Sequence, residues 1–197
     1  MNENTIIIGS SGRNSGKTSL AKFLINKWRG EFPIAALKVT CIDNRSSSCP
    51  RIGQSCGACS SLGGQDFLLE KERGNFPEKD TAQLLSAGAD YVFWLRSLRS
   101  ALHEGYCAFL ERIPRGSLVI CESNSLREVI KPACFIMLID HRYSLEDDCP
   151  SMKLSASRVC DLADITALNF KKPQDFQRIL NQIHIEKNEI GDINIKM

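Results

Sequence analysis

The feature that most constrains the fold is a glycine-rich turn after an apolar run near the amino terminus. The run is TIIIG, residues 5–9, and continuous apolar character is typical of a strand covered on both faces of a sheet. After the turn, apolar residues recur at helical spacing at Leu20, Phe23, Leu24 and Trp28. The turn therefore joins a buried strand to a helix.

The turn ends in Gly16-Lys17-Thr18, with Ser11 at the position of the first glycine. A glycine, four free residues and Gly-Lys-Ser/Thr form the P-loop, in which backbone amides at a helix start surround a phosphate without obstruction from Cβ atoms. A turn that only caps the helix is the alternative.

The P-loop pattern predicts a role for each residue of the turn. Lys17 would offset charge on the β and γ phosphate oxygens, and the Thr18 hydroxyl would bind Mg²⁺. The β-phosphate would lie among the backbone amides of Gly12, Arg13, Asn14, Ser15, Gly16 and Lys17.

Two carboxylates are candidates for catalysis at such a site. Glu122 ends the apolar run SLVICE, where it would face the phosphates and orient water or act on the metal. Asp43 follows the apolar run at residues 34–40, a place where nucleotide-sensing loops often have an acid. Each can also be a solvated or turn carboxylate.

A cysteine-rich segment, residues 41–64, is the second chemical feature. Cys56 and Cys59 form a C-x-x-C pair, whose spacing lets both thiolates reach one ion, and Cys41 and Cys49 precede it. These thiols suit a tetrahedral zinc or an iron–sulfur cluster. A redox pair or an oxidation-prone loop is an equally open alternative.

Strands and helices alternate along the rest of the chain. Apolar runs predict strands at residues 34–40, 91–95, 117–122, 134–140 and 165–169, and apolar periodicity predicts helices near 98–113 and 176–183. Alternation favours one three-layer α/β domain with a mostly parallel central sheet. The domain would span residues 1–185, with the cysteine-rich segment as an insertion and a polar tail at 186–197. Cys121 and Cys134 lie inside apolar runs, so we expect them in the core.

Composition narrows the class of protein. The chain has 197 residues and a net charge of +2 spread along its length, so nothing indicates a nucleic-acid or membrane partner. It contains no run of 18 apolar residues and does not begin like a signal peptide, which favours a cytoplasmic protein. Nine cysteines are then more typical of buried thiols, metal ligands or redox groups than of disulfides.

Several motifs together resemble the molybdopterin-guanine dinucleotide biosynthesis B-type proteins: SGRNSGKTSL, ALKVT, DTAQLLSAGAD and LVICESN. The resemblance implies a P-loop GTP-binding protein of the signal-recognition and MinD-like class, which assists attachment of a nucleotide to molybdopterin and tends to form dimers. It implies phosphate binding by Gly16, Lys17, Thr18 and Ser19, with Lys38, Asp80 and Glu122 facing the site.

The chain also departs from that family. Val39 stands where the family usually has His, Ser123 where it usually has Gly, and the cysteine-rich insertion lies outside the common pattern. GTPases of this class often contact guanine through Asn-Lys-x-Asp after a late strand. The segment ITALNFKKPQD has Asn169 after a predicted strand, but the lysines and the aspartate that follow do not have the spacing of that motif. Asn169 is therefore a candidate base contact only, and the alternative is that it caps a helix or forms a turn.

Three functions remain open, and the resemblance together with the combination of P-loop and cysteine cluster favours the first. The first is a GTP-dependent maturation or adaptor factor for molybdenum cofactor or another metallocofactor, with slow Mg²⁺-dependent hydrolysis and a cysteine loop that binds metal or a partner protein. The second is an ATP-dependent small-molecule kinase, with Glu122 or Asp43 as base and a lid arginine from Arg96, Arg99 or Arg112. The third is a metal-binding regulator that responds to nucleotide without turnover.

If Cys49, Cys56 and Cys59 bind a metal, anaerobically purified protein should carry stoichiometric zinc or iron by elemental analysis. Cys56→Ser should lose that metal, because an incomplete thiolate set no longer closes a tetrahedral site. Cys107→Ser, which lies outside the cysteine-rich segment, should retain it. Metal-free wild-type protein would contradict the metal site.

Overall fold

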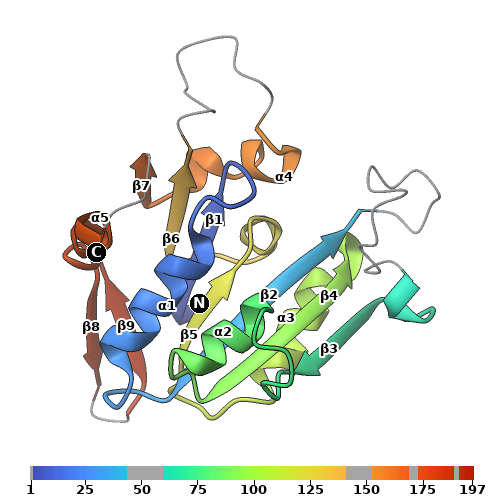
Figure 1. Cartoon of the computed structure of the whole chain (residues 1–197), viewed down its shortest axis with the longest axis horizontal. Coiled ribbons are helices and arrows are strands. Elements are labelled where there is room, and N and C mark those ends of the chain that lie inside the picture. Colours follow the sequence, from blue (N-terminus) through green and yellow to red (C-terminus); the bar gives the residue numbers. More distant parts are fainter. Residues whose placement is uncertain (1, 44–59, 141–151, 169–172, 189–190) are drawn as a thin grey trace.

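A seven-stranded sheet forms the centre of the computed structural model, which describes residues 2–43, 60–140, 152–168, 173–188 and 191–197 (Figure 1). The strands of the sheet are β1 (Asn2–Ser10), β2 (Ile34–Ile42), β3 (Phe67–Lys71), β4 (Tyr91–Leu98), β5 (Leu118–Glu122), β6 (Pro132–Ile139) and β7 (Ile165–Leu168). Their order in space is β3-β4-β2-β5-β1-β6-β7. β3 pairs antiparallel with β4, and the other neighbours pair in parallel. The predicted α/β fold with a mostly parallel sheet is confirmed.

Helices cover both faces of the sheet. They are α1 (Lys17–Trp28), α2 (Asp80–Ser86), α3 (Leu102–Leu110), α4 (Leu154–Ser157) and α5 (Pro173–Leu180), with short 3-10 helices η1 (Ser60–Leu62), η2 (Arg99–Ala101), η3 (Ser125–Glu128) and η5 (Cys160–Leu162). Successive side chains of a strand point to opposite faces, so Ile6 and Ile8 join one core cluster and Ile7 joins the other. α1, α2 and α5 pack in the first cluster, and α3, η3 and α4 pack in the second.

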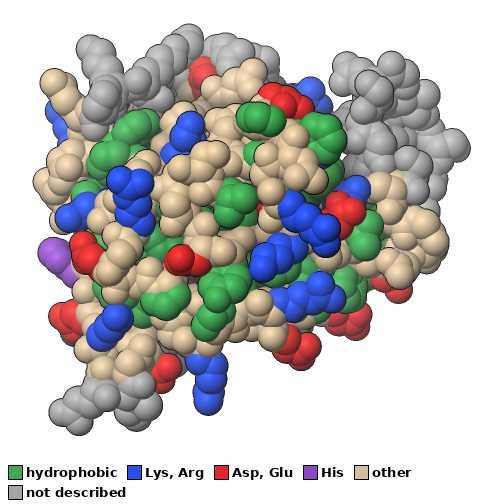
Figure 2. All heavy atoms as spheres, turned by 60° about the horizontal axis from the view of Figure 1, so that its bottom comes forward, with side chains coloured by type: hydrophobic (Ala, Val, Ile, Leu, Met, Phe, Trp, Pro, Cys, Tyr) green, Lys and Arg blue, Asp and Glu red, His purple; other side chains and the backbone are tan. Residues whose placement is uncertain are grey.

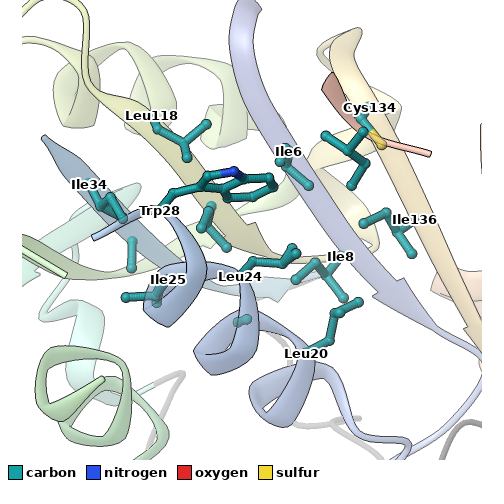
Figure 3. Close-up of a cluster of buried hydrophobic side chains, with 14 of the residues drawn as sticks. Ile6, Ile8, Leu20, Leu24, Ile25, Trp28, Ile34, Leu118, Cys134 and Ile136 are labelled. Atoms are coloured by element: carbon teal, nitrogen blue, oxygen red, sulfur yellow. The ribbon is translucent and has the colours of Figure 1, made fainter. Parts of the chain in front are cut away.

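α1 is held against the sheet by its apolar face. Leu20, Leu24 and Ile25 are fully buried and Trp28 nearly so, and they lie against strand residues such as Ile6 (Figure 3). Each such side chain contributes roughly 1.5–3 kcal/mol relative to exposure. The packing of α1 therefore fixes where the glycine-rich turn before it must lie.

The two cysteines expected in the core are there. Cys121 and Cys134 are fully buried in β5 and β6. Burial raises the pKa of Cys121 well above that of an ordinary thiol and raises the pKa of Cys134 to about 12. Both thiols therefore stay protonated at neutral pH and act as small apolar groups.

β3 is a strand that the sequence does not predict. Its segment FLLEK is only partly buried and lies at the edge of the sheet. The central strands were predicted from continuous apolar runs, which arise where both faces of a strand are buried. An edge strand that is less buried does not show that pattern.

The prediction of a polar tail at residues 186–197 is wrong, because this segment forms part of a hairpin and contributes to the core. β8 (His184–Lys187) and β9 (Ile193–Lys196) form an antiparallel hairpin, and β9 packs against β1 and β6. Ile193 and Ile195 are buried in the same cluster as α1. The alternation Ile-Asn-Ile-Lys buries two side chains in a segment whose overall composition is polar.

The surface mixes charges of both signs. Figure 2 shows Lys and Arg side chains interleaved with Asp and Glu on the face that it draws. Among the helices that the structure describes, none is long and apolar enough to cross a membrane.

Ile195→Ala should lower the free energy of unfolding by about 2 kcal/mol, because it removes buried apolar atoms and leaves a cavity that the surrounding core fills only in part. Asn194→Ala is the matched control, since Asn194 is exposed in the same strand and should change the free energy of unfolding by less than about 0.5 kcal/mol. Urea denaturation measures both. Equal small effects would show that β9 does not belong to the core.

Candidate functional site

The glycine-rich turn, residues 9–16, takes a backbone shape that only a few residue types tolerate. Gly16 has φ 86° and directly precedes α1, and Asn14 has φ 55°. These left-handed conformations suit glycine and, less well, asparagine. Among the residues that the structure describes, no side chain caps the start of α1, so its first amides remain available to a ligand.

The turn lies where the chain changes direction in the sheet. β1 and β5 are parallel neighbours, but α1 follows β1 onto one face and η3 follows β5 onto the other. In open α/β sheets, ligands bind in the crevice outside the carboxyl ends of two such strands. The turn follows the carboxyl end of β1, and Glu122 lies at the carboxyl end of β5, so both stand at this point of the sheet.

Asn124 holds the turn against the end of β5. Its side chain accepts a hydrogen bond from the Ser10 backbone amide at 2.7 Å and donates one to the Ser10 carbonyl at 2.9 Å. Gly9 permits this approach, because a Cβ there would lie 2.7 Å from Asn124 Oδ1 and 2.8 Å from the Phe135 ring. The start of the turn is therefore fixed by a side chain of the neighbouring strand's loop.

Lys17 is folded back over the turn. Its ammonium donates to Ser10 Oγ at 2.6 Å, and that hydroxyl donates to the Gly12 carbonyl at 2.7 Å. Burial lowers the pKa of Lys17, an effect that Glu122 opposes and Lys38 adds to. The cation is thus partly stripped of water and lies within electrostatic reach of a second lysine.

Glu122 is the buried acid of the site. Only 4% of this residue is exposed, and burial raises the pKa of its carboxyl group against the opposite effects of Lys38, a hydrogen bond from the Thr18 hydroxyl, and Lys17. Its Oε1 atom is buried without a hydrogen-bond partner in the described part of the chain. A buried oxygen in that state is a ready acceptor for a proton donor or a cation.

Lys38 lies directly beside this acid. It is opposite Glu122 in the β2–β5 register and forms an ion pair with Asp80, the first residue of α2. Burial lowers the pKa of Lys38, and Glu122 opposes that shift. Lys38 is therefore shared between a buried carboxylate and an accessible one.

The structure brings five of the predicted site residues into one cluster: Lys17, Thr18, Lys38, Asp80 and Glu122. The other predicted phosphate-binding residues lie next to this cluster in the turn and in the first turn of α1. Gly12 and Ser15 are buried, and Arg13, Asn14 and Ser19 are exposed. Ser10 and Asn124, which position the turn, were missed. Their only signal in the sequence is a polar residue at or just beyond the end of an apolar strand.

Asp43 lies in a different cluster. It accepts a hydrogen bond from Arg99 at 2.7 Å, and Arg99 also donates to Glu128 at 2.6 Å. The sequence put Asp43 beside the nucleotide as a catalytic acid; the structure gives it an exposed position beside Arg99. The partner is the first residue of η2, directly after β4, and nothing in the local sequence of Asp43 reveals it.

Two of the three arginines suggested as a kinase lid are held by carboxylate partners in the structure. Arg96 is buried, pairs with Glu70 and lies 4.3 Å from the centre of the Trp94 ring. Arg99 has the two carboxylate partners named above, and Arg112 is exposed just after α3. Arg96 and Arg99 would have to break these pairs in order to cover a phosphate.

Of the four predicted cysteine ligands, the structure describes Cys41 alone. It is half-buried, and burial raises the pKa of its thiol, with Arg99 opposing. Cys49, Cys56 and Cys59 lie outside the described residues, as does Asn169. Within the described ranges, no three His, Cys, Asp or Glu side chains gather as a metal site would require.

No protein family, curated protein or solved structure gives a significant match to this chain.

Asn124→Ala should destabilise the protein by about 1–3 kcal/mol for each Ser10 backbone group left buried without a partner. Asn181→Ala is the control, because the exposed Asn181 amide pairs with Gln177 on the surface of the helix end and should matter little. Chemical denaturation compares the two variants. An Asn124→Ala protein as stable as the control would show that the turn is held by other contacts.

Proposed function

We propose that this chain is a P-loop NTPase that binds a Mg²⁺–nucleoside triphosphate at the start of α1. The observation that supports it best is the meeting of Lys17, Thr18 and Glu122 at an uncapped helix start beside the carboxyl ends of β1 and β5. A helix cap alone would require none of these three groups to converge.

The phosphates would be held by the turn and by Lys17. The open amides of α1 and the positive end of its dipole favour an anion. Without a ligand, Lys17 Nζ donates a hydrogen bond to Ser10 Oγ. A phosphate oxygen is a stronger acceptor for this ammonium than a neutral hydroxyl is. Nucleotide binding would therefore draw Lys17 away from Ser10.

The residues around Thr18 fit Mg²⁺, which prefers oxygen ligands and keeps several waters. The Thr18 hydroxyl would bind the ion, and the unpartnered Glu122 Oε1 could accept from one of its waters. When bound, the ion would neutralise charge on the phosphates.

Glu122 would orient the attacking water in a slow hydrolysis. Burial raises the pKa of its carboxyl group, which makes the ionised form a stronger proton acceptor. Lys38 and Lys17 favour that ionised form, so the carboxylate can accept a proton from the attacking water.

We further propose that the nucleotide is GTP and that the protein assists the maturation of molybdenum cofactor or another metallocofactor, acting as a dimer or with a partner protein. The four motifs that resemble the molybdopterin-guanine dinucleotide biosynthesis B-type proteins support this role. The position of the insertion agrees with it, because the cysteine-rich segment starts at the end of β2, the strand that carries Lys38. A change at the phosphates could thus reach Cys41, which lies on the same strand as Lys38.

Calorimetric titration of reduced protein with GTP and with ATP, each with Mg²⁺, tests the proposal. We expect tight GTP binding and a loss of about a hundredfold or more in Lys17→Ala, which removes a charge-assisted contact to phosphate. Lys27→Ala, an exposed lysine at the other end of α1, should bind as the wild type does. Preference for ATP would favour the kinase, and unchanged affinity in Lys17→Ala would exclude the P-loop assignment.

A further inference from the structure

We propose that Lys38 binds the terminal phosphate of the nucleotide and gives up Asp80 to do so, which makes the site selective for triphosphates over diphosphates. The inference rests on the proposed function and adds to it the residue that distinguishes the two nucleotide states.

The sheet places Lys38 and Lys17 on either side of one carboxylate. Ile8, Glu122 and Lys38 are in register across β1, β5 and β2. Ile8 belongs to the core cluster under α1, so the side chains of this row point to the face that α1 covers. Lys17 at the start of α1 and Lys38 on β2 both interact with Glu122, and they repel each other.

The order of the strands decides which phosphate Lys38 can reach. The turn that would hold the β-phosphate follows β1, and Lys38 lies on β2, with β5 between them. A phosphate in contact with Lys38 must therefore extend across the end of β5, beyond the group that the turn holds. In a triphosphate that group is the terminal phosphate, and a diphosphate has none in this position.

The charges of the cluster balance before any ligand binds. Lys17 and Lys38 face Glu122 and Asp80, so a bound polyphosphate competes with these carboxylates for the two ammonium groups. Glu122 is 4% exposed and fixed in a central strand, and leaving a buried ion pair is costly.

Asp80 is the carboxylate that can leave. Its side chain is 43% exposed in the pair with Lys38, and exposed ion pairs contribute little because water replaces the partner. Asp80 also begins α2, where the positive end of the helix dipole stabilises a carboxylate without Lys38. Exchange of Asp80 for a phosphate is therefore the least costly way to accommodate the ligand.

The test is calorimetric titration of the full chain with GTP and with GDP, each with Mg²⁺, or with ATP and ADP if the protein prefers adenine. In Lys38→Met, we expect triphosphate affinity to fall by about ten- to a hundredfold, the effect of one lost charge-assisted contact, while diphosphate affinity stays within about twofold. In Asp80→Asn, triphosphate affinity should rise several-fold, because Lys38 no longer has a competing carboxylate.

Lys79→Met is the matched control, since Lys79 precedes Asp80 but lies over the Phe76 ring at 4.2 Å. It should leave both affinities unchanged. Equal losses for tri- and diphosphate in Lys38→Met, or weaker triphosphate binding in Asp80→Asn, would overturn the inference. Failure of wild-type protein to bind either nucleotide would instead overturn the proposed function itself, and thermal unfolding of each variant separates loss of binding from loss of fold.

Discussion

The buried carboxylate of Glu122 is the group on which the rest of the site depends. A charge this far from water is tolerated only where opposite charges and hydrogen-bond donors surround it. Lys38, Thr18 and Lys17 supply them from β2 and from the start of α1. These three residues can reach Glu122 because β5 lies between β1 and β2, so the strand order and the charge cluster require each other.

The same arrangement gives the site two different kinds of acid. Glu122 is enclosed at the end of a central strand, whereas Asp80 stands at the exposed start of a short helix. Lys38 pairs with Asp80 and interacts electrostatically with Glu122, so one cation links a fixed partner to an exchangeable one. The difference in burial makes Glu122 the fixed partner and Asp80 the exchangeable one, because losing an ion pair costs more free energy where water is excluded.

Much of the fold could be predicted from the sequence, since burial on both faces leaves a continuous apolar run in each central strand. β1, β2, β5 and β6 show that pattern clearly. The edge strand β3 is less buried, and its apolar run FLL ends at Glu70 and Lys71. The hairpin strand β9 is buried on one side, and its sequence alternates. Period-two alternation over four residues is too short a signal to distinguish from a solvated tail.

The sequence by itself determined the turn and its helix: Gly16, Lys17 and Thr18 sit where a strand meets a helix, and that local order needs no knowledge of distant residues. Only the tertiary structure decided which side chains these residues and their neighbours contact. It set Lys38 against Glu122 and Asp80, tied Asn124 to Ser10, and drew Asp43 away to Arg99. Such contacts join residues far apart in the chain, and strand order and helix packing, rather than local pattern, bring them together.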